Sequence, residues 1–217
     1  MEIEFKKRIL SSIILIPLSF FLVIKSAFLC NFFLFFCFCI SIYEWHCMSN
    51  KRNYYIFGII FLSISFYLTY SLRNNSNDLS LSFLIFVIII CITTDIGGYI
   101  LGKIFKGPKI TKISPNKTYS GMMGSYLFSI ISSFLWINNS NLMVRETYET
   151  IELFFFVIII STTSQIGDLI VSYFKRLSKI KDTGKLIPGH GGLLDRIDGL
   201  LFAMPIAYVI LNFIILK

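Results

Sequence analysis

The stretch IELFFFVIIISTTSQIGDLIVSY, residues 151–173, decides the fold class. It is long enough and apolar enough to cross a lipid bilayer as one helix. Phe and Ile favour strands in water, but a backbone in lipid must satisfy its own hydrogen bonds, so this run is expected to be helical. The run also carries a carboxylate, Asp168, which a simple lipid anchor would not need.

Apolar runs of similar length recur on both sides of this stretch. We therefore expect an all-α, polytopic integral membrane protein with about seven transmembrane helices. The first two runs are short, and they either tilt or pair as a re-entrant hairpin. The predicted spans are Ile9–Ile24, Ala27–Tyr43, Tyr54–Leu72, Leu79–Leu101, Gly121–Ile137, Ile151–Tyr173 and Gly199–Leu216.

The N-terminal sequence MEIEFKKRILSSIILIPLSFFLVI has basic residues before an apolar run, as a signal peptide does. A second apolar run follows almost at once, and no clear small-residue cleavage site separates the two. We therefore predict a retained first span.

The composition agrees with a membrane protein. Of 217 residues, 55% are hydrophobic and only 15% are charged, with a net charge of +8. In a soluble protein this basic excess would suggest nucleic acid. Beside apolar runs it indicates cytoplasmic loops, anionic lipid headgroups or phosphorylated substrates, so we expect no nucleic-acid partner. The five cysteines form no C-x-x-C pair and are expected to pack as apolar residues.

The distribution of Lys and Arg predicts the orientation. With a cytoplasmic N-terminus, most of the 20 basic residues fall on the cytoplasmic side, as the positive-inside rule requires. The two richest loops, 102–120 and 174–198, then both face the cytosol. We divide the chain at residue 90, with N-terminal membrane helices in 1–90 and a catalytic membrane region in 91–217.

Two aspartates lie within predicted spans. An ionised carboxylate facing lipid is costly, so Asp95 and Asp168 are each expected to face the bundle interior and to have a partner. Around Asp168 the helical period places polar residues on one face. These residues are Ser161, Ser164, Asp168, Ser172 and Lys175. Gly98 and Gly102 are four residues apart, a spacing that lets another helix approach closely.

Asp195 and Asp198 lie three residues apart at the entrance to the last span. Paired carboxylates suit Mg²⁺, which combines a few carboxylates with phosphate oxygens. Acidic residues that favour the positive end of a helix are the alternative. The preceding GHGG could bring backbone N–H groups to an anion. Within it, His190 is expected to hydrogen-bond phosphate or the loop itself.

The loop GKIFKGPKITKISPNKTYSG, residues 102–121, carries five lysines. It is either a solvated surface attracted to anionic lipid or a clamp for a triphosphate. Lys117 and Thr118, just ahead of the fifth span, are best placed for the clamp.

These motifs together resemble a known family. The stretch SYFKRLSKIKDTGKLIPGHGGLLDRID, residues 172–198, resembles the signature of phosphatidate cytidylyltransferases, also called CDP-diglyceride synthases. The segments DIGGYILGKIFK (95–106) and ISPNKTYSG (113–121) resemble two further family segments, and YEW (43–45) resembles an E-W pair. The matching signature positions are Ser172, Lys175, Arg176, Lys181, Asp182, Pro188, His190, Gly191, Gly192, Asp195, Arg196 and Asp198.

The resemblance implies transfer of CMP from CTP to phosphatidate, giving CDP-diacylglycerol and pyrophosphate. The implied metal ligands for Mg²⁺ are Asp168, Asp195 and Asp198, with Asp95 a weaker candidate and a second cation left open. Lys175, Arg176, Asp195 and Asp198 are the expected catalytic residues. The expected substrate-binding residues are Ser114, Lys117, Thr118, Ser172, Lys181, His190, Gly191, Gly192 and Arg196. A bacterial inner membrane, membrane lipids and a homodimer complete the expected setting.

The chain departs from the family pattern at two positions. Ser120 and Val171 stand where the family usually has glutamates, which affects the expected turnover rate more than the reaction type. Two rival functions remain open from the sequence. One is a CTP-dependent lipid-alcohol kinase, which would transfer the γ-phosphate. The other is an ion-coupled anion transporter, which predicts inverted repeats.

Overall fold

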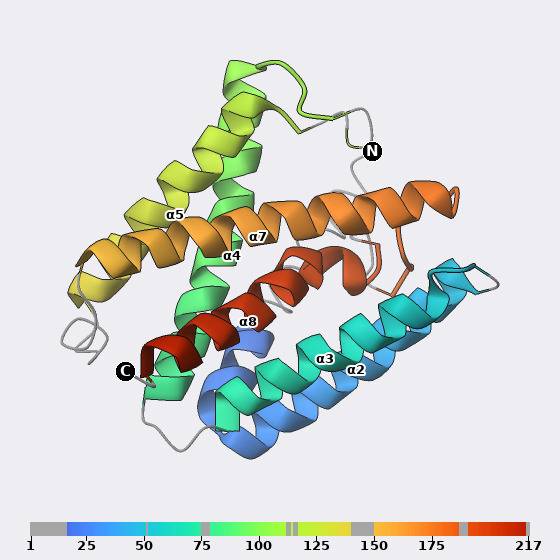
Figure 1. The fold of residues 1–217 in the computed structure, drawn as a ribbon, viewed down its shortest axis with the longest axis horizontal. Helices are drawn as coiled ribbons and strands as arrows, with labels where there is room; N and C mark the ends of the chain where they lie inside the picture. Colours follow the sequence, from blue (N-terminus) through green and yellow to red (C-terminus); the bar gives the residue numbers. More distant parts are fainter. Residues whose placement is uncertain are drawn as a thin grey trace. The chain divides into compact units, whose positions relative to one another are not determined.

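The computed structural model describes residues 17–50, 52–74, 79–111, 114, 117–139, 150–186 and 191–215. Within these residues the regular structure is helical, apart from one isolated antiparallel bridge between Lys109 and Thr118 (Figure 1). The prediction of an all-α protein is confirmed. The helices are α2 (Ala27–Ser49), α3 (Tyr55–Asn74), α4 (Leu79–Phe105), α5 (Tyr119–Asn139), α7 (Thr150–Leu177) and α8 (Leu194–Ile215), and residues 17–25 are also helical.

Five of the described helices, α2, α3, α4, α5 and α7, are long and apolar enough to cross a membrane. The chain is therefore an integral membrane protein. Helix α8 does not meet the same criterion within the described residues, and its start carries Asp195, Arg196 and Asp198. Residues 9–16 of the predicted span Ile9–Ile24 lie outside the described residues, and residues 17–24 are helical. The prediction of about seven spans is thus confirmed only in part.

The chain divides into two compact units. The first contains residues 1–70 and 174–197, and the second contains residues 71–173 and 198–217. Helices α3, α7 and α8 each contribute residues to both units. This division describes packing alone, so the functional boundary placed at residue 90 stays a prediction.

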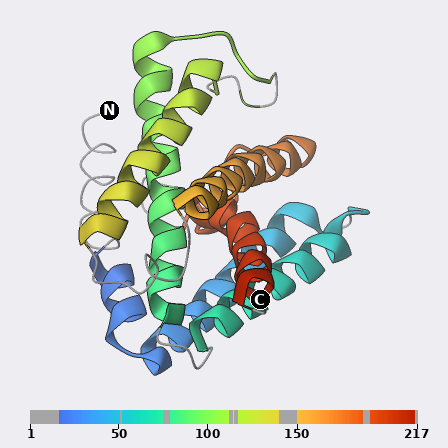
Figure 2. The same cartoon turned by 60° about the vertical axis from the view of Figure 1, so that its left-hand side comes forward.

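In the first unit, α2 and α3 lie side by side (Figures 1 and 2). Phe38 and Phe66 meet edge to face, with ring centroids 5.5 Å apart. Near the loop that joins the helices, the Trp45 indole N–H donates to the carbonyl oxygen of Tyr55 over 3.0 Å. A Cβ at Gly58 would overlap the Trp45 ring, so only glycine admits the indole here.

The last turn of α7 is fastened to this helical hairpin. Phe174 packs against Trp45 with centroids 5.4 Å apart and against Tyr54 with centroids 4.8 Å apart. The hydroxyls of Tyr54 and Ser178 are 2.7 Å apart and share a hydrogen bond. Aromatic rings in such offset or edge-on arrangements stabilise contacts beyond simple burial. The C-terminal end of α7 is therefore fixed against Trp45 and Tyr54.

In the second unit, α4 and α5 touch through glycines. A Cβ at Gly97 would lie 2.9 Å from the carbonyl carbon of Gly124, and one at Gly102 would lie 3.4 Å from the Cα of Gly121. The predicted close approach of another helix at Gly98 and Gly102 is confirmed, because both positions face α5. Figures 1 and 2 both show the two helices side by side.

Hydroxyl groups link α4, α5 and α7 inside the second unit. Thr94 donates to the hydroxyl of Ser161 over 2.9 Å, and Ser125 donates to the carbonyl oxygen of Thr94 over 2.8 Å. Tyr126 and Thr162 share a further hydrogen bond of 2.9 Å. Small polar side chains of this kind hold helices together in lipid, where no hydrophobic effect acts between helices.

Candidate active site

Asp195 lies in the first turn of α8, and three hydrogen-bond donors surround its two oxygens. The structure fills both oxygens: Oδ1 accepts from the Lys175 ammonium over 2.7 Å, and Oδ2 accepts from the backbone N–H groups of Thr183 and Gly192 over 2.8 and 3.1 Å. Gly192 is three residues earlier, so this last bond has the pattern of a capping box. Asp195 thus connects the start of α8 to Lys175 at the end of α7 and to Thr183 and Gly192 in the loop between these helices, here called the signature loop.

The charge state of Asp195 follows from these contacts. Burial alone would raise the pKa of its carboxyl, since the charged form loses water. The hydrogen bonds from Lys175, Thr183 and Gly192, together with the positive charge of Lys175, outweigh burial and hold the pKa below its ordinary value of 3.8. Asp195 is therefore ionised at neutral pH and its charge is shared with Lys175.

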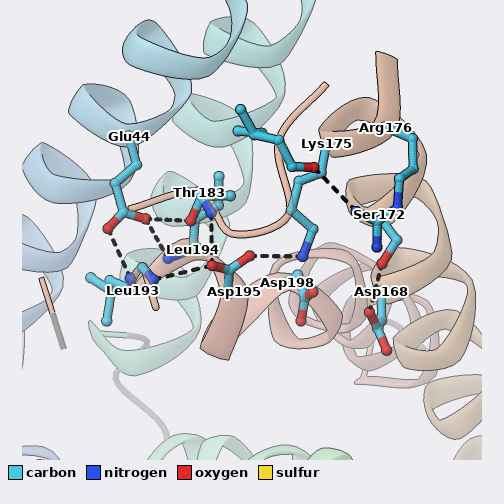
Figure 3. Close-up of polar contacts among 12 residues, drawn as sticks. Glu44, Asp168, Ser172, Lys175, Arg176, Thr183, Leu193, Leu194, Asp195 and Asp198 are labelled. Carbon is cyan, nitrogen blue, oxygen red and sulfur yellow. Dashed lines mark hydrogen bonds and ion pairs between the residues drawn. The ribbon is translucent and has the colours of Figure 1, made fainter. Parts of the chain in front are cut away.

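Glu44 is the residue that the sequence analysis missed. It lies near the end of α2, only 3% exposed, and its carboxylate faces the start of α8 (Figure 3). Oε1 accepts from the N–H of Leu193 over 2.9 Å. Oε2 accepts from the N–H of Leu194 over 2.8 Å and from the hydroxyl of Thr183 over 2.9 Å. A protein carboxylate thus occupies the anion-binding end of the helix.

The glycines of the signature loop make room for the Glu44 carboxylate. A Cβ at Gly184 would lie 2.6 Å from Oε1, and one at Gly192 would lie 2.5 Å from Oε2. Gly191 has a φ of +89°, a backbone conformation that residues with a Cβ rarely adopt. The glycines were predicted to bring backbone to a phosphate. In this structure the N–H groups of residues 192–194 are used by Asp195 and Glu44.

A second charged cluster lies in the second unit. Lys117, from the loop before α5, forms an ion pair of 2.5 Å with Asp168 on α7. Its ammonium also approaches the carbonyl oxygen of Gln165 at 3.5 Å. Ser172 donates to Asp168 over 3.4 Å, a long bond (Figure 3). The expectation that Asp168 has a cationic partner is confirmed, and the partner is a predicted substrate-binding lysine.

The loop that carries Lys117 is fixed by its neighbours. The N–H of Ile110 donates to the carbonyl oxygen of Lys117 over 2.9 Å, next to the antiparallel bridge between Lys109 and Thr118. Thr118 caps α5 by accepting from the N–H of Gly121 over 3.1 Å. Ser120 accepts from the N–H of Gly107 over 3.2 Å. At the first position where the family has glutamate, this chain therefore has a hydroxyl that supports the loop.

The remaining predicted residues differ in exposure. Arg176, Lys181 and Arg196 are exposed, and the Arg176 guanidinium donates to the carbonyl oxygen of Ile180 over 3.2 Å. Ser114 is half-buried in its loop, with its carbonyl oxygen accepting from the N–H of Lys117. Val171, at the second departure from the family pattern, is buried. His190 lies outside the described residues.

The aspartates differ from expectation at one place. Asp198 is 8% exposed, and its Oδ1 accepts from the N–H of Gly199 over 2.9 Å. On α7, Ser161, Ser164, Ser172 and Lys175 are all buried, as their shared face predicted. Asp95 is exposed on its helix, so the prediction that it faces the bundle interior is wrong. Helix α4 instead turns its glycines inward, toward α5.

The fit to a metal ion is limited. Among the described residues, no group of three or more His, Cys, Asp or Glu side chains is arranged to hold a metal ion. Both oxygens of Asp195 already accept hydrogen bonds. Mg²⁺ often uses only one or two carboxylates and completes its shell with water and substrate phosphates. The aspartate oxygens could serve as metal ligands in that mode, but the described residues contain no preformed site of three carboxylates.

Comparison with known proteins gives one consistent result. Residues 54–214 match the cytidylyltransferase family. A phosphatidate cytidylyltransferase of Rickettsia bellii (strain RML369-C) is 35% identical over 171 residues, which is 77% of this chain and 73% of that protein. A phosphatidate cytidylyltransferase of Bacillus subtilis (strain 168) is 32% identical over 163 residues, which is 75% of this chain and 59% of that protein.

Proposed function

We infer that this chain, which belongs to the cytidylyltransferase family, transfers CMP from CTP to phosphatidate and releases CDP-diacylglycerol and pyrophosphate. The family match carries this inference. The structure supports it, because the signature residues Lys175, Gly192 and Asp195 form one hydrogen-bonded network, which Thr183 joins through its backbone N–H. The chain is a nucleotidyltransferase of phospholipid biosynthesis.

The chemistry suits fixed cations. A phosphatidate oxygen attacks the α-phosphorus of CTP, a new P–O bond forms, and the bond to the β-phosphate oxygen breaks as pyrophosphate leaves. The attacking oxygen already carries negative charge, so no strong general base is needed. The barrier is the repulsion between two polyanions, which positioned cations reduce. Lys117, Lys175 and Arg176 are the side chains we assign to this task, and Arg176 can bind phosphate with two N–H groups.

We assign Mg²⁺ to Asp168, Asp195 and Asp198 together with the phosphates of CTP. When bound, the ion would neutralise charge on the phosphate oxygens. Asp168 and Asp198 belong to the second unit and Asp195 to the first, so the convergence of the three is a proposal. Because Asp195 now pairs with Lys175, coordination by Asp195 would require Lys175 to move to another anion, and a substrate phosphate is the natural one.

We place the active site on the cytosolic side of a bacterial inner membrane. The basic loops support this placement through the positive-inside rule. CTP would then arrive from the cytosol and phosphatidate sideways from the bilayer. Further contacts with membrane lipids and a homodimer belong to the same proposal.

The test is a product assay. Purified protein is incubated with CTP labelled at the α-phosphate, phosphatidate and Mg²⁺. We expect labelled CDP-lipid and unlabelled pyrophosphate, whereas a lipid-alcohol kinase would give CDP and lipid phosphate. Asp195→Asn and Asp198→Asn should each lower the rate at least about 100-fold if they act on transition-state charge. Glu152→Gln, which removes an exposed carboxylate from the first turn of α7, is the matched control.

Two results would contradict the proposal. No CDP-lipid from the wild type would remove the assigned reaction. Unchanged rates in both aspartate variants would leave the reaction standing but remove the assigned roles of these carboxylates.

A further inference from the structure

Glu44 is a buried carboxylate near the end of a helix that is otherwise apolar enough to span a membrane. Burying an ionisable group is unfavourable unless hydrogen bonds replace its lost water. Among the described residues Glu44 has three such bonds, to partners that lie 139 to 150 residues away in the sequence. A buried carboxylate with such long-range partners fixes one segment of the chain against another.

The segment that Glu44 fixes is the entrance to α8. Backbone N–H groups in the first turn of a helix have no partner within the helix. Glu44 satisfies those of Leu193 and Leu194, one with each carboxylate oxygen. Its negative charge also favours the positive end of the helix dipole. The start of α8 is therefore held by a side chain from α2.

Thr183 connects Glu44 to the charged pair of the site. Its hydroxyl donates to Glu44, while its backbone N–H donates to Asp195 over 2.8 Å. Asp195 in turn accepts from Lys175 over 2.7 Å. Figure 3 shows the sequence of contacts from Glu44 through Thr183 to Asp195 and Lys175. A shift of Glu44 would move Thr183, and with it one of the backbone N–H donors to the Asp195 carboxylate.

We propose that Glu44 is a positioning residue for cytidylyl transfer: its carboxylate holds Thr183, Leu193 and Leu194 so that Asp195 and Lys175 keep their catalytic geometry. The proposal rests on the function proposed above. Glu44 itself contacts no substrate, because its two oxygens are buried among the N–H groups of Leu193 and Leu194 and the hydroxyl of Thr183.

Glu44→Gln is a sharp test because the side chain keeps its size. Its amide nitrogen would replace either Oε1 or Oε2, and each of these oxygens accepts from a backbone N–H. Both orientations therefore place two donors against each other. We expect kcat to fall about 10- to 100-fold, as for misplacement of reacting groups by about 1 Å. The KM for CTP should change less than about threefold, since mainly transition-state contacts are lost.

Thr183 provides a second, milder test. Thr183→Val removes the hydroxyl but keeps the shape and the backbone N–H, so we expect a fall in kcat of up to about tenfold. Thr183→Ser keeps the hydroxyl and should restore most of the rate. The double variant Glu44→Gln with Thr183→Val should be no slower than Glu44→Gln alone, because both changes act through one contact.

The loop itself can be measured without catalysis. Lys181 and Lys185 are exposed in it, so trypsin cleavage reports how often the loop opens. We expect faster cleavage in Glu44→Gln and Thr183→Val. Ser41→Ala is the matched control, since Ser41 is buried on the same helix and, within the described part of the chain, its hydroxyl donates to the carbonyl oxygen of Cys37 on that helix. Its kcat and cleavage rate should equal those of the wild type.

The outcomes separate the two proposals. If the wild type makes no CDP-lipid, the proposed function fails, while the cleavage rates still show whether Glu44 holds the loop. If the wild type is active and Glu44→Gln keeps its kcat per folded molecule, the positioning role is overturned, even if the variant melts earlier. If Glu44→Gln does not fold, equal kcat values for Thr183→Val and Thr183→Ser overturn the role instead.

Discussion

Two lysine–aspartate pairs, one in each unit, are built in opposite ways. In the first unit the side chains of Lys175 and Asp195 are 11% and 6% exposed, and two backbone N–H groups add to the pair. In the second unit those of Lys117 and Asp168 are 24% and 33% exposed, and the Ser172 hydroxyl adds one long hydrogen bond of 3.4 Å to Asp168.

The two pairs differ in burial and in the number of hydrogen-bond donors to the aspartate, and this difference predicts that they respond differently to an incoming anion. In this structure the Lys175–Asp195 pair is held in place by the loop between α7 and α8, and removing either partner leaves the other as a buried charge without its counterion. The Lys117–Asp168 pair is wetter and has fewer additional bonds. Water weakens its attraction, so a polyanion can take Lys117 from Asp168 at small cost.

The largest predicted effect is on the buried pair. Asp195→Asn leaves the ammonium of Lys175 buried without its carboxylate, and breaking a buried pair in this way costs about 3 to 5 kcal/mol. We expect the free energy of unfolding to fall by about 3 kcal/mol and the unfolding temperature in detergent to fall by roughly 10 °C. Thermal unfolding followed by fluorescence measures this shift.

Replacing both partners tests the cause. The double variant Lys175→Met with Asp195→Asn removes both charges, while the amide oxygen can still accept from the N–H groups of Thr183 and Gly192, and it should recover most of the lost stability while staying inactive. An unfolding temperature for Asp195→Asn equal to that of the surface control Glu152→Gln would mean that the pair is not buried in the way described.

A smaller effect is predicted for pH. The folded-state pKa of Asp195 lies below its ordinary value of 3.8, so its contribution to stability is present above that value and is lost as pH falls through the folded-state pKa. The difference in unfolding temperature between wild type and Asp195→Asn should therefore be constant near neutral pH and narrow below about pH 4. A difference that instead grows in acid would contradict the assigned direction.

The smallest predicted effect on stability concerns the wetter pair. Asp168→Asn should change the free energy of unfolding by less than about 1 kcal/mol, because half-exposed ion pairs contribute little. Its rate of CDP-lipid formation should nevertheless fall at least about tenfold if the carboxylate acts on bound CTP. A rate equal to that of wild type with normal stability would show that Asp168 only holds the Lys117 loop.

Local patterns in the sequence predicted much of this molecule. Apolar runs predicted the spanning helices, although α4 and α7 continue beyond the predicted ends into polar sequence, since Lys175 and Arg176 remain helical. The helical period predicted the buried polar face of α7, and glycine spacing predicted the contact of α4 with α5. In each case the signal lies within one helix and depends on period alone.

The sequence did not predict contacts between distant segments. Glu44 was noticed only within YEW, and its partners follow more than a hundred residues later. The one available signal was a carboxylate near the end of an apolar run, which needs a partner somewhere. Asp95 was misplaced because the rule that intramembrane carboxylates face inward does not say which face of α4 the glycines will claim.

The close packing of α4 against α5 restricts the loop that joins them. Gly97 lies against Gly124 and Gly102 lies against Gly121, so the two backbones approach closely and the helices cannot move apart without losing these contacts. Lys106 directly follows α4 and Thr118 directly precedes α5, so both ends of the loop are fixed, and Lys117 lies beside the second end. A triphosphate that binds here would contact a lysine whose backbone is already fixed, so less conformational entropy of Lys117 is lost on binding.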